Sequence, residues 1–227
     1  MQAEVLRSVH ARGQCRIGLH CHTRKLNRHE HAFLENDTQT HVHWVKKGVM
    51  RLYKSLGNGR RQIVGFAFPG DFVGLGPDAK YLFSAQAVAA TELRAVPKSE
   101  FEAIAREESR FSSKLFEAVS ADLVRAYDLA LTVGQRGSEA GLAAFLLEMH
   151  ARTSEAESMD VLLQIPRTDI ADYLGVTTET VSRTFSKLTK RGLIEMKGRR
   201  GIRLVNRAAL EQLTEGLAGC SHLRFQC

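Results

Sequence analysis

The sequence predicts an α+β protein that starts with an antiparallel β-roll, continues through one long helix and ends in a winged helix-turn-helix. Three observations lead to this prediction. Short β-type runs separated by glycines fill residues 24–98, apolar residues recur every three or four positions through residues 111–133, and Gly175 separates two short amphipathic helices. The chain has 227 residues, of which 44% are hydrophobic, so it can form one or two domains with a substantial core.

These patterns divide the chain into five segments. We expect an N-terminal segment over residues 1–22, the β-roll over 23–106, a dimerisation helix over 107–136, the winged helix-turn-helix over 137–212 and a C-terminal tail over 213–227. The strand-like runs of the roll are HVHWVKKG, VMRLYKS, IVGFAF, PGDFVGLG, FSAQAVAA and ELRAVP. Gly57-Asn58-Gly59 lies between two of these runs and is typical of a hairpin turn.

The long helix carries a narrow apolar seam. Its members follow one another at steps of three and four residues, which places them on one side of the helix: Leu115, Val119, Leu123, Ala126, Ala130 and Val133. Such a seam is the geometry of a contact between two helices, so we expect it to form the interface of a homodimer. A helix packed along its own domain is the alternative. Gly134 and Gly137 are expected to end this helix.

Two short helices follow at the spacing of a helix-turn-helix. Gly175 supplies the turn between them, and Thr177 caps the second helix. Each helix has an apolar face that predicts packing on a core, made of Ile170, Ala171 and Leu174 on the first and of Val181, Phe185 and Leu188 on the second. The second helix of such a motif enters the major groove of duplex DNA.

The other face of the second helix carries an acid, a hydroxyl and a guanidinium. Glu179, Ser182 and Arg183 stand at i, i+3 and i+4, so they project from one side. Arg183 is suited to a bidentate contact with guanine, and Glu179 to accepting from the amino group of cytosine. We interpret the three as base-reading residues. Two strand-like runs joined by the turn Gly198-Arg-Arg-Gly201 follow this helix and are expected to form the wing. The candidates for contacts to the DNA backbone are Thr177, Thr178, Lys187, and the wing residues Arg199 and Arg200.

Charge is distributed unevenly around this motif. The formal net charge is +7, with eight acids and two bases from Glu139 to Ser182 but nine bases and one acid from Arg183 to Arg207. A basic patch placed at the predicted groove-reading helix and wing favours double-stranded DNA as the partner. The sequence contains no stretch of ~20 apolar residues and no signal peptide, so we expect a cytoplasmic protein without membrane contact.

The motif from Asp169 to Leu188 resembles the DNA-binding motif of the Crp/Fnr family, and Glu179-x-x-Ser182-Arg183 is similar to the triplet of its FixK and Fnr branch. The resemblance implies a cyclic-nucleotide-binding-like jelly roll and a homodimer on palindromic sites with TTGAT-like halves. It also implies recruitment of RNA polymerase to genes of low-oxygen, nitrogen-oxide or nitrogen-fixation metabolism. We expect an activator. Repression, or control by the protein's own abundance, stays open.

Cyclic nucleotide is not expected as a ligand. Members of the family that bind it use a glutamate after the turn Gly70-Asp71-Phe72-Val73-Gly74 and an arginine before Ser84-Ala85. In this chain those two positions hold Leu75 and Phe83. A cyclic phosphate would therefore be buried without its charge partner, which is unfavourable.

No cofactor is expected either. The Fnr branch holds an iron–sulfur cluster with four cysteines, and here Cys15 and Cys21 keep one of the intervals while Arg12 and Arg94 stand at the other two positions. We interpret Cys15 and Cys21 as the remnant of a metal site. The alternative is a redox, metal or iron–sulfur-responsive sensor, with a cluster shared between subunits or completed by His10, His20 or His22.

One pattern in the roll also fits a metal enzyme. His41-x-His43 on a strand of a small roll suggests a cupin-like metal enzyme fused to a DNA-binding module. Such a site also needs a carboxylate and a further histidine, but Lys46 and Lys47 follow and the roll has no later histidine. We therefore expect no enzyme activity. Cys220 and Cys227 are candidates for a redox pair or an intersubunit bridge, or they have no function in an exposed tail.

Overall fold

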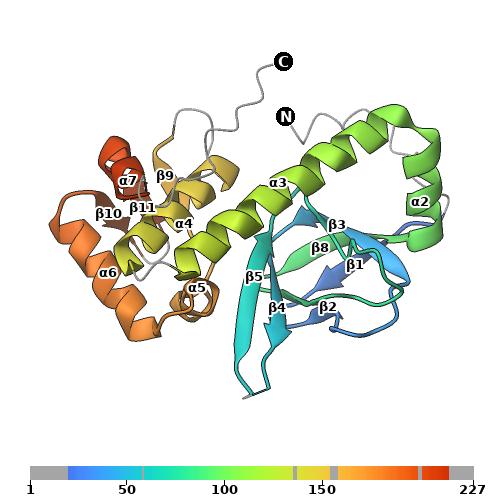
Figure 1. The fold of residues 1–227 in the computed structure, drawn as a ribbon, viewed down its shortest axis with the longest axis horizontal. Helices are drawn as coiled ribbons and strands as arrows, with labels where there is room; N and C mark the ends of the chain where they lie inside the picture. The colour runs from blue at the N-terminus through green and yellow to red at the C-terminus, as the bar shows by residue number, and fades with distance from the viewer. Residues whose placement is uncertain (1–19, 58, 135–136, 154–157, 199–200, 215–227) are drawn as a thin grey trace. The chain divides into compact units, whose positions relative to one another are not determined.

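The computed structural model describes residues 20–57, 59–134, 137–153, 158–198 and 201–214 (Figure 1). The side chains of residues 132–134 lie outside this description. The chain separates into two compact units, Met1–Leu123 and Val124–Cys227. The first contains the β-roll and the second the helix-turn-helix, as the sequence predicts.

Two four-stranded antiparallel sheets form the first unit. The strand order in one is β1 (His22–Leu26), β8 (Thr91–Pro97), β3 (His41–Lys47), β6 (Phe72–Val73). In the other it is β2 (His31–Phe33), β7 (Ser84–Ala87), β4 (Met50–Ser55), β5 (Arg61–Ala67). Consecutive strands of the chain thus alternate between sheets several times, which is the arrangement of a jelly roll.

The core of the roll lies between the sheets. Side chains alternate between the two faces of a strand, so His43 and Val45 of β3 point inward while Val42 and Trp44 point to the outer face. Inside the roll, the rings of Phe33 and Tyr81 stack with their centroids 3.7 Å apart. The other buried members come from both sheets: Leu26, Ala32, Val45, Met50, Ala67, Val73, Ala85, Ala87 and Leu93.

Two helices cover the outer face of the first sheet. α2 (Lys98–Glu107) contributes Phe101, and the beginning of α3 (Ser109–Gly134) contributes Phe111. Their rings pack edge to face at 5.4 Å and bury Val42 and Val96 of the sheet. Leu115, one turn after Phe111, packs against the same cluster. The first turns of α3 are therefore held to the roll by aromatic packing.

The six strand-like runs of the sequence are all confirmed as strands. The predicted hairpin is also confirmed, because β4 pairs with β5 from Met50↔Ala67 to Ser55↔Arg61. Strands β1 and β2 were not among the predicted runs. β1 is an edge strand of largely polar residues, HTRKL, and β2 has three residues. Neither offers the period-two apolar pattern by which a strand is recognised.

The second unit packs four helices around a small sheet. Its helices are α4 (Ser138–Thr153), α5 (Arg167–Leu174), α6 (Thr178–Lys190) and α7 (Arg207–Thr214). The strand order is β10 (Ile194–Lys197), β11 (Gly201–Leu204), β9 (Asp160–Leu162). α4 runs through the centre of this unit and buries Leu142, Phe145 and Leu146. α7 extends past residue 212, where the domain was expected to end.

One expected helix end needs correction. α3 ends at Gly134, as predicted. Gly137, however, belongs to the start of α4, because its carbonyl accepts a hydrogen bond from the amide of Gly141 at 3.0 Å. A search of the described helices finds none with the length and apolar character required to cross a membrane.

Candidate nucleic-acid interface

The turn between α5 and α6 is built by two residues. Gly175 ends α5 in the left-handed conformation, with φ of 69°, which glycine adopts without a steric penalty. Thr177 then starts α6, since its side-chain oxygen accepts a hydrogen bond from the amide of Thr180 at 3.1 Å. The side chain of Thr177 thus has a capping role in the protein itself, in addition to the DNA backbone contact predicted for it.

The apolar face of α6 is buried as the spacing predicts. Val181, Phe185 and Leu188 are each at most 3% exposed. Thr184 is buried beside them, and its hydroxyl donates to the carbonyl of Thr180 at 2.8 Å. The sequence pattern did not identify Thr184, because a threonine on an apolar face has no apolar signature.

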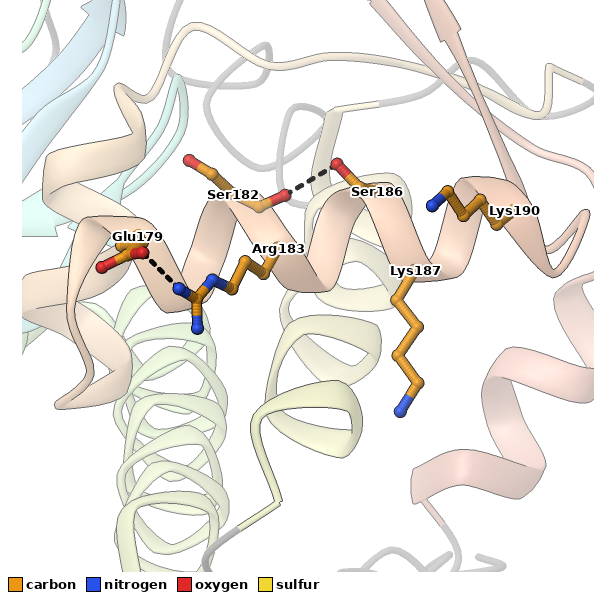
Figure 2. A pocket seen from close by; sticks show the side chains of 6 residues that line it. All are labelled: Glu179, Ser182, Arg183, Ser186, Lys187 and Lys190. Carbon is orange, nitrogen blue, oxygen red and sulfur yellow. Dashed lines mark hydrogen bonds and ion pairs between the residues drawn. The ribbon is translucent and has the colours of Figure 1, made fainter.

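The opposite face of α6 is exposed and brings the three predicted base-reading residues together. Glu179, Ser182 and Arg183 line a shallow hollow of about 510 Å³ along the helix (Figure 2). Its other lining residues are Ser186, Lys187 and Lys190. Ser186 and Lys190 were missed by the sequence analysis, although they stand seven and eleven positions after Glu179 and so fall on the same helical face.

Within this hollow Glu179 and Arg183 form an ion pair. Arg183 Nη2 donates to Glu179 Oε1 across one helical turn, and both side chains are at least 70% exposed. The hydroxyl of Ser182 donates to the carbonyl of Thr178 at 2.9 Å, and Ser186 donates to the carbonyl of Ser182 at 3.1 Å (Figure 2). Exposed ion pairs of this kind contribute ~0–1 kcal/mol, so base edges can replace the pair at little cost.

Lys187 of α6 and Arg191, the residue after the helix, meet a carboxylate from α4. Glu139, in the first turn of α4, accepts from Lys187 with one oxygen, and its other oxygen lies 2.6 Å from Nη1 of Arg191. The hydrogen bond from Lys187 and the neighbouring charges hold the pKa of Glu139 below its ordinary value. Lys187 was predicted to contact the DNA backbone. Arg191 and Glu139 were not identified from the sequence.

Arg167 connects the two helices of the motif. It begins α5, and its guanidinium lies 3.1 Å from the ring centroid of Phe185 in α6. Burial lowers the pKa of Arg167 to about 10. A guanidinium stacked on an aromatic face is an attractive contact. Arg167 therefore links α5 to α6 through this contact, and it too was not identified from the sequence.

The hairpin after α6 has the form of a wing. β10 and β11 pair from Ile194↔Leu204 to Lys197↔Gly201, and Gly198 opens the turn with φ of 62°. Arg199 and Arg200, predicted to contact DNA phosphates, lie outside the described residues. Their role stays a prediction.

Helix α3 carries an exposed apolar stripe. Large side chains on it are between 46% and 73% exposed: Phe116, Val119, Leu123, Val124 and Tyr127. Ala126 and Ala130 are exposed as well, and the side chain of Val133 lies outside the described residues. Leu115, predicted for the seam, packs on the roll instead. With Phe116 in its place, the steps to Val119, Leu123, Ala126 and Ala130 alternate regularly between three and four residues.

The two positions that the family resemblance assigns to a cyclic nucleotide hold apolar side chains. Leu75 packs against the outer cluster with Phe101 and Phe111. Phe83 lies before β7, with Nζ of Lys54 5.8 Å from its ring centroid. These residues do not fit a cyclic phosphate, since neither side chain supplies a charge or a hydrogen bond.

The residues considered for a metal are dispersed or buried. Cys21 packs against the outer cluster of the roll, and Arg94 lies on β8 beside Trp44 of β3. His43 is 2% exposed, while the rings of His22 and His41 lie 5.5 Å apart at their centroids. Among the residues that the structure describes, no group of three His, Cys, Asp or Glu side chains is placed to hold a metal. Cys15, His10, Cys220 and Cys227 lie outside them.

Comparisons with known proteins match both units. Residues 142–213 match the Crp-like helix-turn-helix domain, and residues 23–108 match the cyclic nucleotide-binding domain. The nitrogen fixation regulation protein FixK of Bradyrhizobium diazoefficiens is 41% identical over 186 residues, which cover 81% of this chain and 78% of that protein. The transcriptional activatory protein AadR of Rhodopseudomonas palustris is 37% identical, over 73% of this chain and 70% of that protein. The solved structure of FixK2 from Bradyrhizobium japonicum matches with a TM-score of 0.80 at 35% identity, covering 86% of this chain and 98% of that one.

Proposed function

The chain belongs to the Crp/Fnr family of transcriptional regulators, in the branch of the FixK proteins, and on that premise we propose that it is a homodimeric activator that reads a palindromic DNA site. Each half of the site is TTGAT-like, and the bound dimer recruits RNA polymerase. The target genes serve low-oxygen, nitrogen-oxide or nitrogen-fixation metabolism. The names of its relatives, a nitrogen fixation regulator and a transcriptional activator, support this assignment.

The observation that carries the proposal is the exposed face of α6. Glu179, Ser182 and Arg183 project from it together, and the opposite face is buried in the domain. A helix held in this way can enter a major groove with its N-terminal half toward the bases. Arg183 then reads guanine, Glu179 accepts from cytosine, and Ser182 meets a neighbouring base edge. Thr178 and Lys187, with the wing residues, contact the backbone.

A second copy of the chain accounts for the exposed stripe of α3. Phe116, Val119 and Leu123 lose contact with water if the same helix of a partner packs against them. An alternating spacing of three and four residues supports a helix pair. We propose that the two helices run parallel, an arrangement that would bring two copies of α6 to one palindrome. The two subunits of the proposed dimer would thus each read one half of the palindrome.

We propose that binding to DNA requires neither a cyclic nucleotide nor an iron–sulfur cluster. Leu75 and Phe83 support the first part, because a buried cyclic phosphate would have no charge partner there. Arg94, where a cluster ligand would be needed, supports the second. The roll then serves mainly to hold α2 and α3.

The test is binding of purified chain to a fluorescent duplex containing a TTGAT-like palindrome. Binding is measured by anisotropy with and without cyclic AMP, on samples prepared with and without oxygen, and iron is assayed in each. We expect tight binding to the palindrome and much weaker binding to a scrambled duplex, unchanged by either condition. Equal affinity for both duplexes would contradict sequence reading. Binding that needs cyclic AMP or iron would contradict the ligand-independent part alone.

A further inference from the structure

A carboxylate lies beside α6, on the side where DNA phosphates are expected to approach this helix. Glu139 in the first turn of α4 contacts Lys187 with Oε1 and Arg191 with Oε2, the second at 2.6 Å. Its side chain is 22% exposed, whereas those of Lys187 and Arg191 are 62% and 45% exposed. The Glu139 side chain is thus mostly covered, whereas the side chains of the two cations are more exposed to water.

The position of Glu139 is fixed by the contact between α4 and α6. Next to it, the hydroxyl oxygens of Ser138 and the buried Thr184 lie 3.3 Å apart, within hydrogen-bond distance. Glu139 also lies at the N-terminus of α4, where a negative charge is favoured by the helix dipole. The carboxylate is therefore held against α6 by the fold and does not depend on the two cations for its place.

Cations on the exposed part of α6 differ in what they contact. Lys187 and Arg191 share Glu139, and Arg183 contacts Glu179. Lys190, which lines the same hollow, makes no salt bridge to a carboxylate of the described residues. A carboxylate and a phosphate bind lysine and arginine through the same charge-assisted hydrogen bonds. DNA therefore competes with Glu139 for two cations but finds Lys190 available.

We propose that Glu139 is an internal competitor for DNA phosphate, which holds Lys187 and Arg191 and so lowers the affinity of the regulator for duplex DNA of any sequence. The inference rests on the proposed function and concerns the same surface. Because each phosphate contact releases counterions, a cation already neutralised by Glu139 contributes less to the salt dependence of binding. Glu139 thereby limits the electrostatic part of binding and leaves the base contacts of α6 as the main source of affinity.

Glu139→Gln removes the charge while keeping the size of the side chain. We expect roughly three- to tenfold tighter binding to a random duplex, the equivalent of two exposed ion pairs. The slope of log affinity against log salt concentration should become steeper by about 0.9 to 1.8, because one or two cations released from Glu139 can each neutralise a phosphate. The matched control is Glu211→Gln, which makes the same change of net charge in the same unit but breaks an ion pair with Arg207 on α7.

The measurement is anisotropy of full-length protein on a random duplex and on the palindrome at several salt concentrations. The gain of Glu139→Gln should disappear when Lys187→Gln and Arg191→Gln are added. If Glu139→Gln behaves as Glu211→Gln does while the parent chain binds DNA, the inference is overturned and the proposed function stands. Weaker binding to both duplexes also overturns it. Failure of the parent chain to bind any duplex overturns the proposed function itself.

Lys187→Gln and Lys190→Gln give an independent test in the parent chain. Lys187 must leave Glu139 to reach a phosphate, so its loss should weaken random-duplex binding less than the loss of Lys190. An equal or larger effect of Lys187→Gln contradicts the inference, even where Glu139→Gln does not fold.

Discussion

Arg183 and Glu179 contact each other on the exposed face of α6, so DNA has to separate them before either can read a base. The pair is more than two-thirds exposed on both sides and is therefore cheap to break. The ion pair places the guanidinium of Arg183 beside Glu179 in the N-terminal turn of α6.

Arg183→Ala removes the guanine contact and should cost about 1–3 kcal/mol on the preferred palindrome, with loss of preference at one base pair per half-site. Lys190→Ala is the control. The loss of a phosphate contact should weaken binding to all sequences alike and lower the slope of log affinity against log salt by about 0.9. Anisotropy against a set of single-base variants distinguishes the two. A uniform loss in Arg183→Ala would show that it contacts the backbone.

His43 is a buried group with a predicted effect on stability. Burial, then the charge of Arg24, lowers its pKa to about 3. The folded protein therefore keeps His43 neutral, whereas the unfolded chain protonates it below about pH 6.5. Because the unfolded state binds the extra proton, stability falls as the pH drops from about 6.5 to 3.

At pH 5 this effect should amount to about 2 kcal/mol relative to neutral pH. Urea unfolding of the parent chain and of His43→Leu at several pH values measures it. The variant should lose much of the acid dependence, because the buried position no longer carries an imidazole. An unchanged pH profile in His43→Leu would mean that other groups dominate acid unfolding.

At the scale of single elements, α6 depends on its cap. Thr177→Ala removes the acceptor for the amide of Thr180 and should lower the free energy of unfolding by about 1 kcal/mol. Thr178→Ala, one residue further, leaves the cap in place and should cost less. Urea unfolding of both variants makes the comparison. If both cost the same, the helix does not depend on the Thr177 side chain.

Helix α3 provides a second prediction at this scale. Leu123→Glu places a charge in the exposed stripe and should yield monomers, because a charge buried in a helix interface has no partner. Sedimentation measures the mass, and circular dichroism checks that the helix is retained. Lys114→Glu introduces the same charge nine residues before Leu123, on the opposite side of the helix, and should leave the dimer intact. Dimers of unchanged stability in Leu123→Glu would place the interface elsewhere.

Across the whole molecule, the sequence predicted the two units and the motif that defines each, since both rest on strong local patterns. Gly175 and Thr177 have their positions because a turn and a cap require those residue types. Helical spacing alone was enough to predict that Glu179, Ser182 and Arg183 share one face of α6. Helical spacing predicts Leu115 for the seam, whereas the structure packs Leu115 on the roll and exposes the adjacent Phe116. This difference depends on the packing of Phe111 on the roll, which helical spacing does not contain.

Contacts between distant segments could not be predicted in the same way. The rest of helix α4, the strand β9 and the helix α5 separate Glu139 from Lys187 and Arg191 along the chain. No sequence pattern places the carboxylate of Glu139 beside these two cations. The same holds for Arg167 on Phe185. Strands β1 and β2 were missed because one is polar and the other very short. These features depend on tertiary packing, which overrides local pattern.

The central claim is that two copies of α6 read one palindrome. Its most direct test is the mass of the protein–DNA complex in sedimentation, on a duplex with both TTGAT-like halves and on one with a single half. We expect two chains on the full palindrome and a large loss of affinity for the single half. One chain per palindrome, or equal affinity for both duplexes, would contradict the account.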